Sequence, residues 1–243
     1  MSLTREQLIY MSKVSEQTER FEDMIGYMKQ VVTSKEPLST EERNLLSVAY
    51  KNSVGSRRTA WRALSAIEQK EEAKGGKHLN LLREFKKKIE EELGNFCNEI
   101  IGLLDEYLIP GAADSETKVF YYKMKADYYR YISEYATGDL RKRVADGASQ
   151  SYSEASKIAE ELPTTNPIRL GLALNYSVFY YEVLNEPQKA CSLAKQAFDD
   201  AIADIEQLSE DQYKDSTTIM QLIRDNLTLW TSELAEEGGD DQN

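Results

Sequence analysis

Apolar residues recur every three or four positions along almost the whole chain, which is the spacing of one face of an α-helix. The segment 77–108 shows the pattern most clearly, with apolar residues at Leu81, Leu82, Phe85, Ile89, Leu93, Phe96, Ile100, Leu103 and Leu104. Strand-like alternation between turn dipeptides does not occur, and only 5 prolines and 12 glycines interrupt the pattern. The pattern therefore predicts an all-α protein.

Capping residues and helix breakers divide this pattern into helices. Thr4-x-x-Gln7 and Ser39-x-x-Glu42 are capping boxes, and the second opens a long helix that ends at about Ala73, before Gly75-Gly76. Periodicity does not settle whether residues 5–33 form one helix or two. Later helices are predicted in 77–108, from Asp114 or Ser115 to Gly138, in 139–162, after Asn166-Pro167, after Glu186-Pro187, and from Ser209 to near Leu234.

Short loops between these helices favour antiparallel neighbours in a single domain, residues 1–234. The remaining segment, 235–243, is acidic and contains glycine. It is predicted to be a disordered tail that either visits a basic site or is inert.

A tyrosine-rich run, VFYYKMKADYYRYISEY at 119–135, is predicted to be a buried helix. Lys123 and Arg130 in it are seven residues apart, or two helical turns, so both cations lie on one side with Asp127 between them. Lys51 and Arg58 repeat this spacing in 45–61. One such pair alone is more often a solvated face, but two pairs among tyrosines indicate an anion site. Asp127 fits better as a partner of Arg130 than as a catalytic acid.

The last helix carries two apolar stripes, whereas a surface helix needs one. Their members are Met220, Ile223, Leu227 and Trp230 in the first, and Ile219, Leu222, Asn226 and Leu229 in the second. One stripe faces the core; the other faces an open groove or, as is commoner, a second helix layer. The helix after Pro167 presents Asn175, Val178 and Glu182 at a similar spacing. Because an amide both donates and accepts hydrogen bonds, this surface suits a peptide backbone.

A basic wall that faces an apolar wall would bind a phosphorylated peptide, with the phosphate on the cations. The chain has 30 Lys and Arg against 42 Asp and Glu, a formal net charge of -12, which opposes attraction to nucleic acid or anionic membranes. Cys97 and Cys191 have no metal or redox spacing, and neither a signal peptide nor a membrane span is visible. These features predict a cytoplasmic protein that does not insert into membranes.

Clustered cations also stabilise phosphoryl transfer, so an enzyme acting on phosphate esters is one alternative. The sequence lacks its chemistry: His78 is the one histidine, GGKHL is no phosphate-binding loop, and Glu90, Glu91 and Glu92 spread around a helix. We therefore expect no catalytic residue, metal or cofactor. A second alternative is a helical scaffold for unmodified peptides.

Four blocks identify a family resemblance. RNLLSVAYKNSVG at 43–55, YYKMKADYYRYISE at 121–134, NPIRLGLALNYSVFYYE at 166–182 and DSTTIMQLIRDNLTLW at 215–230 closely resemble the signature blocks of 14-3-3 proteins. The resemblance implies nine antiparallel helices in a cup-shaped protomer with an amphipathic groove, assembled as a dimer. It also implies an adaptor, not an enzyme, that binds phosphoserine or phosphothreonine motifs in client proteins and regulates their activity, localisation or interactions.

The resemblance assigns roles by matching positions. It implies that phosphate is held by Lys51, Arg58, Arg130 and Tyr131, and that the peptide is bound by Lys123, Asn175, Val178, Glu182, Ile219, Leu222, Asn226 and Leu229. It places Arg20, Asp23, Phe85, Lys88 and Glu92 at the interface of a homodimer, or of a heterodimer with a paralogue. Arg20 would pair with Glu92, and Asp23 with Lys88.

The chain departs from the family pattern at one position. Many animal 14-3-3 proteins read Arg-Arg-Ser-Ser-Trp where this chain has Arg57-Arg58-Thr59-Ala60-Trp61, and phosphorylation of the second serine weakens the dimer. Because Ala60 cannot accept a phosphate, the resemblance implies a dimer that resists this regulation unless Thr59, which is turned about 100° away on the helix, takes its place.

Overall fold

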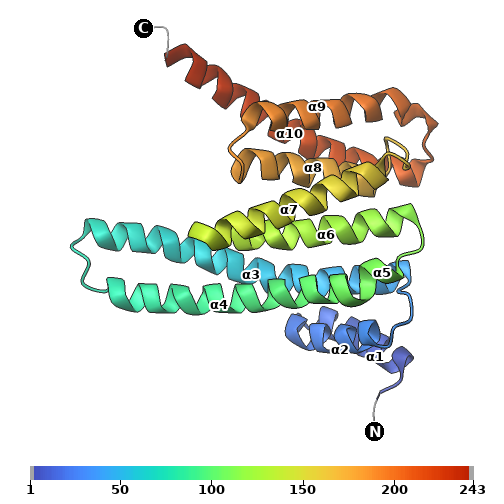
Figure 1. The fold of residues 1–243 in the computed structure, drawn as a ribbon, viewed down its shortest axis with the longest axis horizontal. Coiled ribbons are helices and arrows are strands. Elements are labelled where there is room, and N and C mark those ends of the chain that lie inside the picture. The colour runs from blue at the N-terminus through green and yellow to red at the C-terminus, as the bar shows by residue number, and fades with distance from the viewer. Residues whose placement is uncertain (1–2, 241–243) are drawn as a thin grey trace. The chain divides into compact units, whose positions relative to one another are not determined.

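The computed structural model describes the backbone of residues 3–240 and the side chains of residues 3–236. These residues are helical almost throughout and form no β-strand, so the all-α prediction is confirmed (Figure 1). The chain divides into two compact units, Met1–Ala112 and Ala113–Asn243, which are described separately below. None of the described helices is long and apolar enough to span a lipid bilayer.

The first unit consists of α1 (Arg5–Gln17), α2 (Phe21–Thr33), α3 (Thr40–Ala73) and α4 (Leu79–Leu103), followed by the π-helical turn η1 (Leu104–Leu108) and α5 (Ile109–Gly111). Both predicted capping boxes are present, at Thr4 and Ser39. Residues 5–33 form two helices, because Glu19 takes a positive φ of 55° and turns the chain. Since α4, η1 and α5 follow without a break, they act as one helix that ends at Gly111.

The core of this unit lies where consecutive helices pack side by side. α1 packs on α2, α2 on α3, and α3 on α4. The side chains that fill these contacts are fully buried, among them Met24, Met28, Leu46, Tyr50, Leu93 and Ile100. The hydroxyl of Tyr50 donates to Glu99 over 2.6 Å, and Lys29 donates to the same carboxylate over 2.6 Å. A polar contact therefore ties α2, α3 and α4 together.

The second unit consists of α6 (Ser115–Ser133), α7 (Gly138–Ala159), α8 (Pro167–Glu182), α9 (Pro187–Asp204), the short 3-10 turn η2 (Ile205–Gln207) and α10 (Glu210–Asp240). Asp114 and Asn166 cap α6 and α8, as the sequence predicts. With α4, η1 and α5 taken as one, residues 3–240 contain the nine predicted helices.

The predicted end of the last helix near Leu234 is wrong, because α10 continues to Asp240. Ala235 and Glu236 are good helix formers, and they extend the preceding turns without a break. The predicted tail therefore does not become irregular at residue 235. Residues 241–243 of that tail lie outside the described part of the chain.

Two apolar clusters form the core of the second unit. α6, α7 and α8 share the first, around Val119, Ala148, Tyr152 and Phe179. α8, α9 and α10 share the second, around Leu170, Ala194, Ile223 and Trp230. Small residues let α7 lie close to α6: a Cβ at Gly147 would stand 3.0 Å from the ring of Tyr129. α8 belongs to both clusters and so fixes the positions of α6 and α10 relative to each other.

Candidate functional site

A buried carboxylate on α6 organises the polar residues of the second unit. The Asp127 side chain accepts hydrogen bonds from Lys123 Nζ over 2.9 Å and from Asn175 Nδ2, which lies 3.0 Å from each carboxylate oxygen. The Tyr152 hydroxyl donates to Oδ1, and Arg130 Nη2 lies 3.7 Å from the same oxygen. The structure thus brings Lys123, Arg130 and Asn175, all predicted from the sequence, to one acceptor.

The charges of this cluster stabilise one another. Burial by itself raises the pKa of Asp127, but the charges of Lys123 and Arg130 outweigh it, so the pKa lies below the ordinary value. Burial likewise opposes the charge of Arg130, yet Tyr152 and Asp127 keep its pKa above the usual range. Because Asp127 is ionised at neutral pH, it is not a general acid there, and its role as the partner of Arg130 is the better interpretation.

Arg130 is held on more than one side. It is 6% exposed, its Nε donates to the Tyr152 hydroxyl over 3.2 Å, and its guanidinium carbon lies 5.0 Å from the centre of the Tyr131 ring. Among these contacts, only Asp127 reaches an Nη group, at 3.7 Å from Nη2, so Nη hydrogen-bond donors remain for a ligand. A planar guanidinium fixed in this way is suited to phosphate.

Tyr152 is the residue of this cluster that sequence reasoning missed. It lies on α7 in a stripe of small buried residues that comprises Val144, Ala148, Ala155 and Ala159. A tyrosine in such a stripe needs a partner for its hydroxyl. That need was the available signal, although the sequence does not say which residue meets it.

The two stripes of α10 have different surroundings. Met220, Ile223 and Trp230 are buried, and the Trp230 ring stacks on Tyr181 with centroids 4.7 Å apart. In the second stripe, Leu222 is 49% exposed and Leu229 is 54% exposed. Burial of both stripes between helix layers, the commoner expectation, is therefore wrong: the second stripe is an open apolar surface.

The remaining predicted peptide contacts lie on α8 and α10 and are buried to different depths. Val178 on α8 and Ile219 on α10 are partly buried and pack against the same core cluster. Asn226 is partly buried, whereas Glu182 is exposed at the end of α8. Because Asn175 Nδ2 already donates to Asp127, the atom that Asn175 offers to a ligand is its carbonyl oxygen.

The other two predicted phosphate ligands belong to the first unit. Lys51 and Arg58 lie on α3 two turns apart, so they share one side of the helix. Lys51 is exposed and has no hydrogen bond or ion pair with any described residue, whereas Arg58 is half-buried. An exposed lysine with no partner can accept an anion without first breaking a contact.

The predicted interface residues also lie in the first unit, and three of their four charges have partners within the chain. Arg20 pairs with Asp23 on α2, and Glu92 accepts from Arg57 Nε over 2.7 Å. Phe85 on α4 is 52% exposed, and Lys88 is exposed as well.

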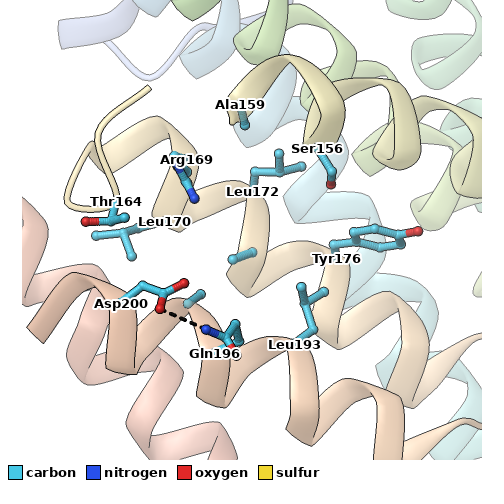
Figure 2. Close-up of a pocket in the computed structure, with 12 residues that line it drawn as sticks. Ser156, Ala159, Thr164, Arg169, Leu170, Leu172, Tyr176, Leu193, Gln196 and Asp200 are labelled. Carbon is cyan, nitrogen blue, oxygen red and sulfur yellow. Dashed lines mark hydrogen bonds between the residues drawn. The ribbon is translucent and has the colours of Figure 1, made fainter. Parts of the chain in front are cut away.

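A separate cavity of about 160 Å³ opens between α7, α8 and α9 (Figure 2). Apolar side chains such as Leu172 and Leu193 line it together with Arg169 and Asp200. Arg169 donates to the Leu162 carbonyl over 2.6 Å, and Asp200 accepts from Gln196 over 2.8 Å, so both have structural partners. None of the predicted site residues lines this cavity. Among residues 3–236, no three His, Cys, Asp or Glu side chains converge as metal ligands.

Comparison with known proteins identifies the family of this chain. The family model described as 14-3-3 protein matches residues 11–231. Curated relatives include Protein BMH2 of Saccharomyces cerevisiae, 57% identical over 100% of this chain and 90% of that protein. Checkpoint signal transducer rad25 of Schizosaccharomyces pombe is 56% identical over 96% of this chain and 87% of its own length. The 14-3-3 protein homolog of Candida albicans is 59% identical over 95% and 88%, respectively.

Members of this family are non-enzymatic adaptors, which excludes the alternative of an enzyme acting on phosphate esters. The family model spans most of the chain, and the relatives are more than half identical over nearly its whole length. The chain therefore belongs to the 14-3-3 family.

Proposed function

We propose that this protein binds phosphoserine and phosphothreonine motifs of client proteins in an amphipathic groove and thereby regulates their activity, localisation or interactions. The phosphate is held by Lys51, Arg58, Arg130 and Tyr131. The flanking peptide is bound by Lys123, Asn175, Val178, Glu182, Ile219, Leu222, Asn226 and Leu229. The family resemblance of the sequence assigns these positions, and each lies within residues 11–231, which the family model matches.

The observation that carries this proposal is the fixed orientation of Arg130. Tyr152 and Asp127 both contact the guanidinium, and the nearby Asn175 is oriented by the same carboxylate. A phosphate monoester carries about −1.5 to −2 charge at neutral pH and pairs with a guanidinium through two hydrogen bonds. A buried arginine whose position is already fixed loses little entropy when it binds such a group.

The open stripe of α10 supports the peptide part of the proposal. Leu222 and Leu229 are each about half exposed, so the side chains beside a phosphorylated residue can bury them further. The same surface would also serve a scaffold for unmodified peptides. The two functions differ in whether removal of the phosphate abolishes binding.

We also propose a cytoplasmic homodimer, or a heterodimer with a paralogue, that forms through Arg20, Asp23, Phe85, Lys88 and Glu92. In the single chain Arg20 pairs with Asp23, and Glu92 pairs with Arg57. On association Arg20 would exchange this partner for Glu92 of the other protomer, and Asp23 would turn to Lys88. The exposed ring of Phe85 supplies apolar area for the contact.

Calorimetry with one client-derived peptide, in phosphorylated and unphosphorylated forms, tests this function. We expect tight binding of the phosphorylated form and at least a hundredfold weaker binding of the other, because two charge-assisted hydrogen bonds are worth about 3–6 kcal/mol. Equal affinities would support the scaffold for unmodified peptides. Phosphorus NMR of the mixture should show no release of phosphate over hours.

A further inference from the structure

The hydroxyl of Tyr152 joins two residues that the proposed function assigns to the ligand, although Tyr152 itself is out of reach. The side chain is fully buried, and its ring stacks on Tyr176 with centroids 5.0 Å apart. Its hydroxyl donates to Asp127 Oδ1 and accepts from Arg130 Nε over 3.2 Å. With its proton and one lone pair in use inside the core, the hydroxyl acts through these neighbours and not on a ligand.

We propose that Tyr152 is a positioning residue of the phosphate site, which sets the affinity for phosphopeptides by fixing Arg130 and Asp127 together. The inference rests on the proposed function. Arg130 Nε is anchored by the hydroxyl, so the plane of the guanidinium is set, while Asp127 Oδ1 approaches only Nη2, at 3.7 Å. Asp127 is anchored by the same hydroxyl. Each of its carboxylate oxygens lies 3.0 Å from the Asn175 amide nitrogen. The hydroxyl oxygen of Tyr152 therefore orients Arg130, which is proposed to bind the phosphate, and, through Asp127, Asn175, which is proposed to bind the peptide.

The direction of these hydrogen bonds is fixed at neutral pH, where a phosphate monoester is ionised. Burial raises the pKa of Tyr152, and the neighbouring Asp127 carboxylate raises it further, to well above the ordinary value. The hydroxyl consequently keeps its proton and donates it to Asp127. Arg130 keeps its own proton on Nε and donates it to the hydroxyl oxygen.

The chain offers a matched control for removal of this hydroxyl. Tyr176 carries the other ring of the stack, and its hydroxyl lies 3.0 Å from that of Tyr180, not from Asp127 or Arg130. Tyr152→Phe and Tyr176→Phe each delete one hydroxyl from the same pair of rings and keep the aromatic packing. We expect Tyr152→Phe to weaken phosphopeptide binding about tenfold, because a hydrogen bond to each of two charged groups is lost. Tyr176→Phe should stay within about twofold of the wild type.

A second measurement reports on Arg130 without any ligand. In the NMR spectrum of the wild-type protein, the Arg130 Nε–H should exchange slowly with solvent. This protection should persist in Tyr176→Phe and disappear in Tyr152→Phe, whereas a purely structural role for Tyr152 would not single out this proton. Both variants are also checked for folding by circular dichroism.

Three results would overturn the inference: fast exchange of the Arg130 Nε–H in the wild type, unchanged affinity in Tyr152→Phe, or an equal loss in both variants. Failure of the proposed function looks different. In that case the wild type would not prefer the phosphorylated peptide, while the exchange of the Arg130 Nε–H would still respond to Tyr152→Phe.

Discussion

Reversal of the charge at Lys51 is the sharpest test of the phosphate site. Lys51 lies in the middle of α3, its side chain is exposed, and it has no hydrogen bond or ion pair with any described residue. Glutamate forms helices about as well as lysine. Lys51→Glu should therefore leave the fold and the thermal unfolding temperature almost unchanged.

The effect on binding should be large by comparison. A hydrogen bond to a charged group contributes about 1.5–3 kcal/mol, and about 1.4 kcal/mol is a tenfold change in the dissociation constant. Loss of one such bond from Lys51 weakens phosphopeptide binding by about 10- to 150-fold. The introduced carboxylate adds repulsion, because it would lie where the phosphate binds. The total loss should exceed a hundredfold.

Isothermal calorimetry with a phosphopeptide measures this loss, and Lys142→Glu is the matched control. Lys142 is exposed on α7 and has no ion pair with the rest of the described chain. Its reversal changes the net charge of -12 by the same two units, at a residue that the proposal does not assign to the site. We expect less than a twofold effect from Lys142→Glu. Binding by Lys51→Glu within about threefold of the wild type would refute the assignment of Lys51 to the phosphate.

Three further predictions concern the apolar wall, the buried carboxylate and the dimer. Leu229→Ala should weaken phosphopeptide binding about three- to tenfold by calorimetry. Burial of a leucine side chain contributes about 1.5–3 kcal/mol, and about half of this free energy can still be gained when a peptide covers Leu229. An unchanged affinity would remove Leu229 from the wall. Because the pKa of Asp127 is lowered on folding, its stabilisation is complete above its unfolded pKa of about 3.9 and is lost as the pH falls through the folded value. Urea unfolding should thus give a steeper loss of stability below pH 4 in the wild type than in Asp127→Asn, and parallel curves would contradict the lowered pKa. Ala60 is half-buried on α3, and Ala60→Glu should dissociate the proposed dimer at micromolar concentration, since a buried unpaired charge costs several kcal/mol; sedimentation as a dimer would place Ala60 outside the interface.

Most helix boundaries could be predicted because their signals are local. Ser39, Asp114 and Asn166 each precede a helix and accept a hydrogen bond from a backbone N–H two or three residues later. The break between α1 and α2 lacks such a signal. Glu19 adopts a positive φ of 55° that non-glycine residues seldom adopt, and neither glycine nor proline marks the turn. Periodicity alone therefore does not decide between one helix and two helices in residues 5–33.

The residues of the candidate site also differ in whether their contacts are local or distant in the sequence. The spacing of Lys123, Asp127 and Arg130 along one helix predicts their shared side, and the observed ion pairs confirm it. The partners that complete the cluster are distant: Tyr152 is 25 residues from Asp127, and Asn175 is 48 residues from it. Only the packing of α7 and α8 on α6 brings them together. A tyrosine in an apolar stripe indicates that a partner exists, but no local pattern names that partner.

The position of Asp127 also explains how a strongly acidic chain keeps a cationic site. A carboxylate beside a phosphate site repels the ligand, yet without it two cations would have to be buried with no compensating charge. Here Lys123 and Arg130 outnumber the single carboxylate, so the cluster retains one net positive charge. Both oxygens of Asp127 accept hydrogen bonds, from Lys123, Tyr152 and Asn175. The carboxylate thus fixes the cations at a small cost in attraction, because donors of the protein already occupy its lone pairs.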